Sequence, residues 1–353
     1  MGSNNIKQYV RSIDRVVLFI TSDVFYIILY SAMVIVFLPW LKLGFTGYIM
    51  ATLAAGLLRV VFMYILSPEL RAARLWRLDL PVLKEMLQYS VPAAISGLAW
   101  WLVTTSNRFF ILHFLGEYYN GIYAMANKIA NLIVTANTIF LMAWNMSSIK
   151  EKDNNFSAFF SRLFEYFSTL QFAIMLGILA VLDPVFRYLI DPQYSEAAYL
   201  VPVLMLSVLY YSFLTYYGVI FIAYKKSKDG MYITIVVGIA GMPLNYILIR
   251  LFDLLGIAIA VVFIILLYLV LVIFYVERFM KTQVNYFRLL LNLCICSAGM
   301  VLYMFIRNEL LKFSAICILF LVFLLVNIKT AISSYKFAKE TLLPLAVKKL
   351  TPR

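Results

Sequence analysis

Long, uninterrupted apolar runs are the feature that most limits what this chain can fold into. A helix needs roughly 20 apolar residues to cross a bilayer. Ten runs reach that length, at residues 16–38, 44–66, 91–115, 121–146, 160–182, 197–223, 231–250, 254–276, 286–306 and 313–333. Only helices and closed barrels satisfy their backbone groups in lipid, and barrel strands are about 10 residues long and alternate in polarity. We therefore expect an all-α, polytopic membrane protein.

The composition excludes several other classes. The 353 residues are 64% hydrophobic and 13% charged, and the mean hydropathy is +0.91. Soluble domains average about 45–50% apolar and about 25% charged residues. No soluble domain is left to bind nucleic acid, and the outer loops are too short for an enzyme domain. We expect no enzyme, no cofactor and no metal site, and we interpret His113 as a packed or hydrated side chain.

The basic residues predict the orientation in the membrane. With the N-terminus placed inside, 22 of the 30 Lys and Arg residues fall in inner segments and five in outer ones. Cytoplasmic loops carry the excess of Lys and Arg. The pattern therefore predicts ten spans with both termini in the cytoplasm.

Two cations, Arg108 and Lys128, lie inside apolar runs that offer them no acid. At 1.5 Å of rise per residue, both lie roughly 10–12 Å inside the outer ends of neighbouring helices. Polar residues share their helix faces: Thr104 beside Arg108, and Asn127, Asn131 and Thr135 beside Lys128. Such a charge costs about 2.5–3.5 kcal/mol at the bilayer centre. Either these groups line a cavity that receives an anion, which we favour, or the cations snorkel to the interface while Asn and Thr join helices.

A second pair of charges has a simpler interpretation. Asp23 and Arg59 lie at similar depths in the first two runs, near their inner ends. We expect them to form a structural ion pair and not a substrate site.

A short internal repeat joins two pairs of runs. Residues 41–51 read LKLGFTGYIMA and residues 252–260 read FDLLGIAIA, with Gly47 and Gly256 in matching places. Each stretch connects two helices at the outer side. The two helix pairs are therefore expected to be equivalent, as in parallel repeats.

Four stretches carry a resemblance to a known family: SVPAAISGLAWWL, SNRFFILHFLGEYYNGIYAMANKI, YLVPVLMLSVLYYSF and GMPLNYILIRLFDLLGIAIA. They resemble the polysaccharide flippases (O-antigen or Wzx-type, oligosaccharide flippase family), whose superfamily includes the MATE drug exporters and the peptidoglycan lipid flippase. The family's Asp-Arg pair corresponds to Asn107 and Arg108, so the acid is missing here. In the late motif Asn245 matches, and Arg250 stands where Pro is usual.

The resemblance implies a MATE-like fold of two lobes and a role in moving an undecaprenyl-pyrophosphate-linked oligosaccharide across the bacterial inner membrane. The glycan would serve surface polysaccharide such as the O-antigen of lipopolysaccharide, and other polysaccharide-assembly proteins are possible partners. Arg108 and Lys128 would bind the pyrophosphate. The neutral groups of the cavity would contact sugar or line the path: Thr104, Asn107, Asn127, Asn131, Thr135 and Asn245.

The resemblance also suggests how the chain is divided. Residues 1–67 would be a two-helix remnant of the N-terminal lobe, and residues 68–90 a cytoplasmic amphipathic linker. Residues 91–280 would be the complete C-terminal lobe, and residues 281–353 two additional helices with a basic tail. The first four helices of such a transporter would then be missing. Two alternatives stay open: a MATE-type drug or cation antiporter, which would need buried acids, and a non-functional truncated fragment. The glycan, the coupling ion and the oligomeric state are not indicated.

Overall fold

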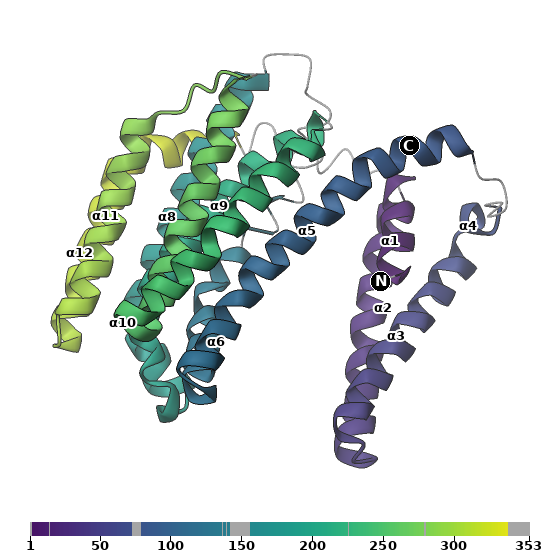
Figure 1. Ribbon diagram of the computed structural model, residues 1–353, viewed down its shortest axis with the longest axis horizontal. Helices are drawn as coiled ribbons and strands as arrows, with labels where there is room; N and C mark the ends of the chain where they lie inside the picture. The colour runs from purple at the N-terminus through teal and green to yellow at the C-terminus, as the bar shows by residue number, and fades with distance from the viewer. Residues whose placement is uncertain are drawn as a thin grey trace. The chain divides into compact units, whose positions relative to one another are not determined.

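The computed structural model describes residues 2–13, 15–72, 79–135, 137–138, 140–141, 156–224, 226–278 and 280–337. Over this part of the chain every regular element is a helix, which confirms the expected all-α class. The chain divides into two compact units, Met1–Leu83 and Lys84–Arg353 (Figure 1).

The first unit is a helical hairpin with a short helix packed against it. In chain order its elements are α1 (Gly2–Ser12), α2 (Val16–Ile35), the π-helix η1 (Val36–Trp40), α3 (Gly44–Leu66) and α4 (Pro68–Ala72). α1 is too polar for hydropathy to indicate it, but Val10 on α1 is buried with Leu18 and Met63. Pro39 lies inside η1 and has no backbone N–H to donate, which accounts for irregular helix before the turn.

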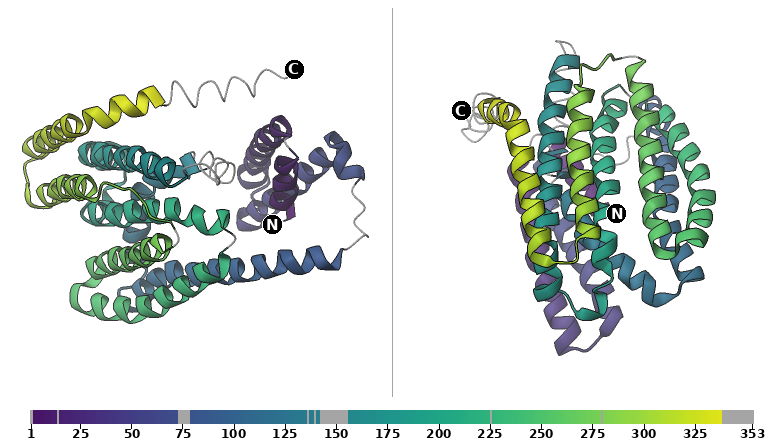
Figure 2. Two further views of the ribbon diagram at one scale, coloured as in Figure 1. Left: turned by 90° about the horizontal axis from the view of Figure 1, so that it is seen from above. Right: turned by 90° about the vertical axis from the view of Figure 1, so that its left-hand side faces the viewer.

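The second unit contains the remaining helices. Its elements are α5 (Leu80–Phe114, which begins just before the division), α6 (Glu117–Ala130), α8 (Phe156–Leu189), the 3₁₀-helix η2 (Pro192–Tyr194), α9 (Ala197–Ala223), α10 (Ser227–Glu277), α11 (Tyr286–Phe305) and α12 (Glu309–Phe337). The described residues among 132–141 are also helical. α9 is the central helix, with both Tyr216 and Tyr217 fully buried. α11 and α12 lie side by side and pack on α8 (Figure 2).

α10 is two helices in sequence, because its backbone leaves helical geometry at Phe252 and Asp253. The 51 residues would span about 77 Å if straight, far more than the roughly 30 Å of a bilayer core. A Cβ on Gly256 would lie 1.9 Å from the carbonyl oxygen of Leu248, so only glycine fits this turn. The predicted runs 231–250 and 254–276 are the two arms.

Each turn of the predicted repeat has a residue with positive φ three residues before its matching glycine, and the first turn has a further one, Lys42, with φ +52°. Gly44 has φ +56° and Asp253 has φ +50°, and each lies three residues before the matching glycine, Gly47 or Gly256. A Cβ on Gly47 would meet Leu43 Cβ at 2.8 Å, so this turn is also too close for a side chain. Both glycines therefore lie at turns without room for a side chain, and the equivalence of the two helix pairs stays a prediction.

Seven helices are long and apolar enough to cross a membrane among the described residues: Val17–Trp40, α3, α8, α9, α10, α11 and Glu309–Thr330 of α12. α10 supplies two crossings because it folds back at Asp253. α5 holds nearly all of the predicted run 91–115 and α6 only the first part of the run 121–146, of which residues 136, 139 and 142–146 lie outside the described residues; neither helix is among the seven. α5 mixes its apolar residues with polar ones such as Asn107 and Arg108, and α6 has 14 residues.

Within the expected linker 68–90, the structure describes α4 (Pro68–Ala72) and, from Leu80, the beginning of α5; residues 73–78 lie outside the described residues. The second half of this linker begins α5, which continues past Pro92 to Phe114 as one helix. Pro92 is buried and lies well inside α5, where it removes one backbone hydrogen-bond donor.

Candidate functional site

Arg108 on α5 and Lys128 on α6 are both exposed on the surface of the second unit. Neither forms an ion pair with a carboxylate among the described residues. α6 follows α5 directly, through a turn in which Gly116 has φ +92°. The structure therefore presents two uncompensated cations on consecutive helices, as the sequence suggested.

Asn107 and Asn245 lie beneath this surface and contact each other. Both are buried, and the Asn245 side-chain amide donates to Asn107 Oδ1 at 2.7 Å. The bond joins α5 to the first arm of α10 across 138 residues of sequence. Asn107 therefore fixes the turn of α5 that carries Arg108, and its neutral amide can do so without burying a charge.

A tyrosine connects the two helices near the cations. The buried phenol of Tyr123 on α6 lies near the side chains of Asn107 and Asn127 and close to the Arg108 guanidinium. Asn127 also donates to the Tyr123 carbonyl at 3.2 Å. The structure thus brings Arg108, Asn107 and Asn127 together around Tyr123, which lies in a stretch that carries the family resemblance but was not predicted as a site residue.

The remaining predicted residues lie on exposed helix surface. The Thr104 hydroxyl donates to the carbonyls of Trp100 and Trp101, at 3.1 and 3.0 Å. The Thr135 hydroxyl is 3.4 Å from the Asn131 carbonyl, and Asn131 ends α6. Both hydroxyls are used within their own helices, but each can still accept a hydrogen bond.

The first unit holds a three-membered charge cluster. Arg59 Nη2 lies 3.1 Å from Asp23 Oδ1, and Lys7 Nζ lies 2.5 Å from Asp23 Oδ2. Arg59 is only 5% exposed and its guanidinium lies over the Tyr26 ring, 5.3 Å from the centroid. The Arg59–Asp23 contact is a charge contact without hydrogen-bond geometry, and Arg59 Nε has no partner among the described residues. The contact of Lys7 with Asp23 was not predicted, because the apolar runs did not predict the helix α1 that carries Lys7.

A second ion pair of the first unit is exposed to water, in contrast to the buried Arg59. Arg15 Nη2 lies 2.6 Å from Glu69 Oε1, and both side chains are well exposed. A hydrogen bond from its own backbone, helped by Arg15 and Ser67, lowers the pKa of Glu69 below its ordinary value. Exposure to water keeps such a pair weak.

Polar contacts also attach α11 and α12 to α8. The Arg288 guanidinium pairs with Glu165 and donates to the Thr330 hydroxyl at 2.7 Å. Asn292 and Asn327 are buried and exchange side-chain hydrogen bonds at 3.2 and 2.8 Å. The apolar runs alone gave no sign of the contact between Glu165 and Arg288.

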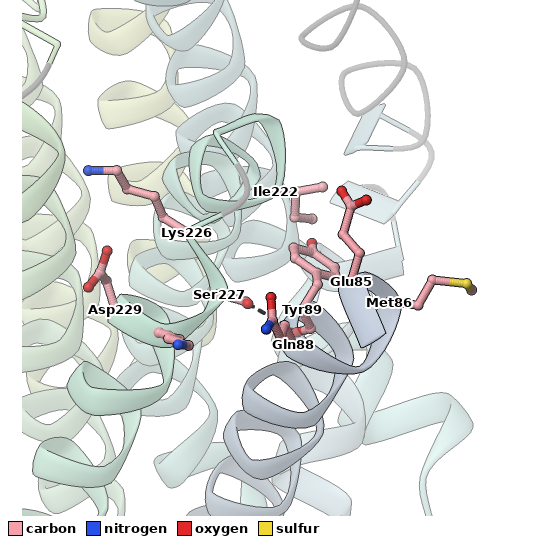
Figure 3. A pocket seen from close by; sticks show the side chains of 9 residues that line it. Glu85, Met86, Gln88, Tyr89, Ile222, Lys226, Ser227 and Asp229 are labelled. Atoms are coloured by element: carbon pink, nitrogen blue, oxygen red, sulfur yellow. Dashed lines mark hydrogen bonds between the residues drawn. The ribbon is translucent and has the colours of Figure 1, made fainter. Parts of the chain in front are cut away.

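The described cavities lie elsewhere than the predicted residues. One, of about 330 Å³, lies between α5, α9 and α10, and it shares three residues with a second cavity of about 680 Å³ at the start of α10. Figure 3 shows the second cavity, with Glu85, Gln88 and Tyr89 of α5 beside the first turn of α10. None of the eight predicted cavity residues lines either one.

Comparison with known proteins identifies the class of this helical membrane protein. A family model described as "Polysaccharide biosynthesis protein" matches residues 7–199, more than half of the chain. The chain belongs to this polysaccharide biosynthesis family. No curated protein sequence matches it.

A solved structure shows the fold. The chain is similar to "Lipid II flippase MurJ, inward closed conformation", with a TM-score of 0.59 and 12% sequence identity. The match covers 91% of this chain and 67% of that one. The resemblance to polysaccharide flippases is thereby confirmed, together with a fold that is shared with a flippase. The protein is a multi-pass membrane protein of polysaccharide biosynthesis.

Proposed function

We propose that the protein moves a lipid-linked oligosaccharide across the bacterial inner membrane for surface polysaccharide synthesis. The observation that carries the proposal is the pair of exposed cations, Arg108 and Lys128, on consecutive helices without an acid partner among the described residues. The family membership and the fold shared with a lipid II flippase support it.

The substrate's pyrophosphate is the anion that these cations would bind. The planar Arg108 guanidinium donates to two phosphate oxygens at once, and Lys128 adds a flexible point charge. Asn127, Asn131, Thr104 and Thr135 lie on the same two helices and offer amide and hydroxyl groups to sugar. Asn107 and Asn245 act indirectly, since their mutual bond holds α5 in place.

The rival function, export of cationic drugs, requires carboxylates inside the membrane. Among the described residues of α5, α6, α9 and α10, every Asp and Glu lies near a helix end or at the break of α10. An anionic substrate therefore suits these helices better than a cationic one.

Surface display of glycan in a bacterial host that lacks its own flippase tests the proposal. Arg108→Ala and Lys128→Ala should each reduce display by about 10-fold or more, because a charge-assisted hydrogen bond contributes about 1.5–3 kcal/mol. Arg108→Lys keeps the charge but loses the two-oxygen geometry, so we expect a partial loss. Removing a cation from a span does not impede insertion, so membrane abundance should hold.

Arg250→Ala is the matched control. Arg250 is an exposed cation of α10 in the same unit, but it lies over the rings of Phe114 and Tyr246. Its loss should leave display largely unchanged. Normal display by the Arg108→Ala/Lys128→Ala double variant at normal abundance would contradict the proposed role of the cations.

A further inference from the structure

The cavity of about 330 Å³ within the second unit is not used by the two cations of the proposed function. It lies between α5, α9 and both arms of α10, and neither Arg108 nor Lys128 lines it. Small-molecule pockets measure about 300–1,000 Å³, so this one is at the lower end. It therefore has room for one ring-sized group and not for a whole oligosaccharide.

Aromatic rings and glycines shape this cavity. The Trp100 ring stacks on Tyr211 with centroids 5.4 Å apart and 7° between the planes, and the Tyr268 centroid lies 5.7 Å from that of Trp100. All three rings line the space. A Cβ added to Gly97 or to Gly218 would meet no atom within 4 Å, so these glycines leave the space open. The negative face of an aromatic ring attracts weakly positive C–H groups, such as those of a sugar ring.

The lining of the cavity is uncharged. No Asp, Glu, Lys or Arg is among the described residues that surround it. A charged ligand would lose its hydration there without gaining an opposite charge, which is costly. The cavity therefore suits a neutral group.

Hydroxyl groups of the lining can still form hydrogen bonds to a ligand. Ser96 donates to the Pro92 carbonyl and Thr234 to that of Gly230, but a hydroxyl that donates its hydrogen can also accept. The Tyr211 hydroxyl has no hydrogen-bond partner in the part of the chain that the structure describes, so it can donate as well as accept. A hydrocarbon chain would leave these groups unsatisfied at a cost, whereas the hydroxyls of a sugar would satisfy them.

The cavity lies along α5 from Arg108. α5 is one helix from Leu80 to Phe114. Gly97 precedes Arg108 by 11 residues, which places it roughly 16 Å away along the axis and within about 20° around it. Trp100 is roughly 12 Å from Arg108 along the axis. A sugar joined directly to a pyrophosphate at Arg108 would stay near that residue, whereas later sugars of the chain extend to the cavity.

We propose that this cavity binds one sugar of the transported oligosaccharide, the second or third from the pyrophosphate. The inference rests on the proposed function and adds a glycan-recognition site to it. The apolar face of the sugar lies against Trp100, its hydroxyls donate to Ser96 and Thr234, and the Tyr211 hydroxyl donates to it. The site thereby distinguishes a lipid with an extended glycan from one with a single sugar.

Binding of three lipids to the purified full chain in nanodiscs tests the site. The probes are undecaprenyl pyrophosphate alone, the same lipid with its first sugar, and the lipid with the complete repeat unit of the glycan that the wild type displays at the cell surface. Native mass spectrometry gives the three dissociation constants. The wild type should bind the complete lipid about 10-fold more tightly than the one-sugar lipid, because the added sugar gains stacking and hydrogen bonds.

Substitutions in the cavity should remove this advantage of the complete lipid. Gly97→Leu and Gly218→Leu should each abolish it and leave binding of the two shorter lipids within about twofold of the wild type. Gly177→Leu on α8, where a Cβ also meets open space, is the control outside the cavity. Tyr211→Phe removes one hydroxyl and should reduce the advantage about threefold or more. Tyr232→Phe, at an exposed tyrosine of α10 outside the cavity, should not.

The cation variant separates this inference from the proposed function. Arg108→Ala/Lys128→Ala should weaken binding of all three lipids by a similar factor and keep the advantage of the complete lipid. An equal loss for the one-sugar lipid in Gly97→Leu and Gly218→Leu would overturn the inference, because leucine would then obstruct the path to the cations.

The full advantage in both leucine variants and in Tyr211→Phe would also overturn it. Tyr211→Phe alone decides the matter if a leucine variant is not recovered folded. Unchanged binding by the cation variant would contradict the cation site of the proposed function and leave the result for the cavity intact.

Discussion

At the scale of residues, Asp23 is one carboxylate shared by two cations. Arg59 is almost fully buried, whereas the Lys7 side chain is 17% exposed and comes from the short helix α1. Without Asp23, Arg59 would keep only the Tyr26 ring as a compensating group among the described residues. A buried charge that loses its partner is far more costly than the loss of a complete pair.

This asymmetry gives a stability prediction for the first unit. Asp23→Asn should lower the free energy of unfolding of the purified protein by about 3 kcal/mol, and with it the melting temperature, because Arg59 is left buried and unpaired. Arg59→Met should cost less, since Asp23 keeps Lys7 at 2.5 Å. The double variant should be more stable than Asp23→Asn alone. Scanning fluorimetry in detergent and abundance in membranes measure these effects.

The exposed pair supplies the control for that series. Arg15→Gln removes a cation from Glu69 in water, where ion pairs contribute little, so stability should hardly change. Additive losses from Asp23→Asn and Arg59→Met in the double variant would show that the two side chains are not coupled.

Equal depth in two apolar runs was enough to suggest Asp23 and Arg59 as neighbours. The role of Lys7 could not be predicted, because α1 is too polar for hydropathy to indicate it and packs through Val10 against Leu18 and Met63. The Asn107–Asn245 bond was equally hidden. Both asparagines were selected for their polarity, but contact across 138 residues depends on how helices pack, which periodicity does not encode.

At the scale of elements, the break in α10 depends on one close approach. The Leu248 carbonyl, at the end of the first arm, occupies the place where a side chain at position 256 would begin. The sequence indicated a glycine turn there from its repeat with residues 41–51. The distance between this Cβ position and the Leu248 carbonyl could not be predicted from the sequence. A glycine that merely occurs at a turn cannot be distinguished there from one that is sterically required.

Gly256→Ala should therefore open the turn between the arms of α10. The new Cβ would lie 1.9 Å from a backbone oxygen, so the arms must separate. We expect the free energy of unfolding to fall by more than about 2 kcal/mol. Gly177→Ala is the matched control, since its Cβ meets nothing within 4 Å. There, alanine should stabilise the helix by about 0.5–1 kcal/mol. Unchanged stability of Gly256→Ala would show that the turn tolerates a side chain.

The last two helices show where element-level prediction stopped. Hydropathy placed them at 286–306 and 313–333, close to α11 and α12. They were expected as an additional pair, with no contact specified. In the structure their polar groups contact α8 and each other, through Arg288 with Glu165 and Asn292 with Asn327. Such interhelical bonds are a common means of joining helices in lipid.

At the scale of the whole molecule, the apolar runs and the spans agree wherever the helix is uniformly apolar. The predicted runs 44–66 and 197–223 have the same bounds as α3 and α9. At α5, polar residues such as Asn107 and Arg108 interrupt the run, and this helix does not qualify as a span by composition. The run 121–146 is described only in part, so α6 does not test that prediction.

The orientation of the chain can be predicted despite that ambiguity. Among the described residues, the seven qualifying helices would make eight crossings, since α10 folds back. If α5 and α6 both cross or neither crosses, the count stays even, and we expect both termini on one side of the membrane. The basic residues, 22 of 30 in the predicted inner segments, predict that this side is the cytoplasm. A reporter joined after Phe337 should be active only as a cytoplasmic fusion.

The turn between α5 and α6 decides between eight and ten crossings. If both helices span, Glu117 faces the outside. If they do not, it faces the cytoplasm, while every other loop keeps its side. We expect a phosphatase inserted after Glu117 to be active in the periplasm, because a polar face can cross a membrane when it faces protein or water. Insertions after Asp191 and Lys281 serve as outer and inner references. Inactive phosphatase at Glu117 beside active phosphatase at Asp191 would place Arg108 and Lys128 on helices that do not cross, and would remove the geometric basis for a transmembrane substrate path there.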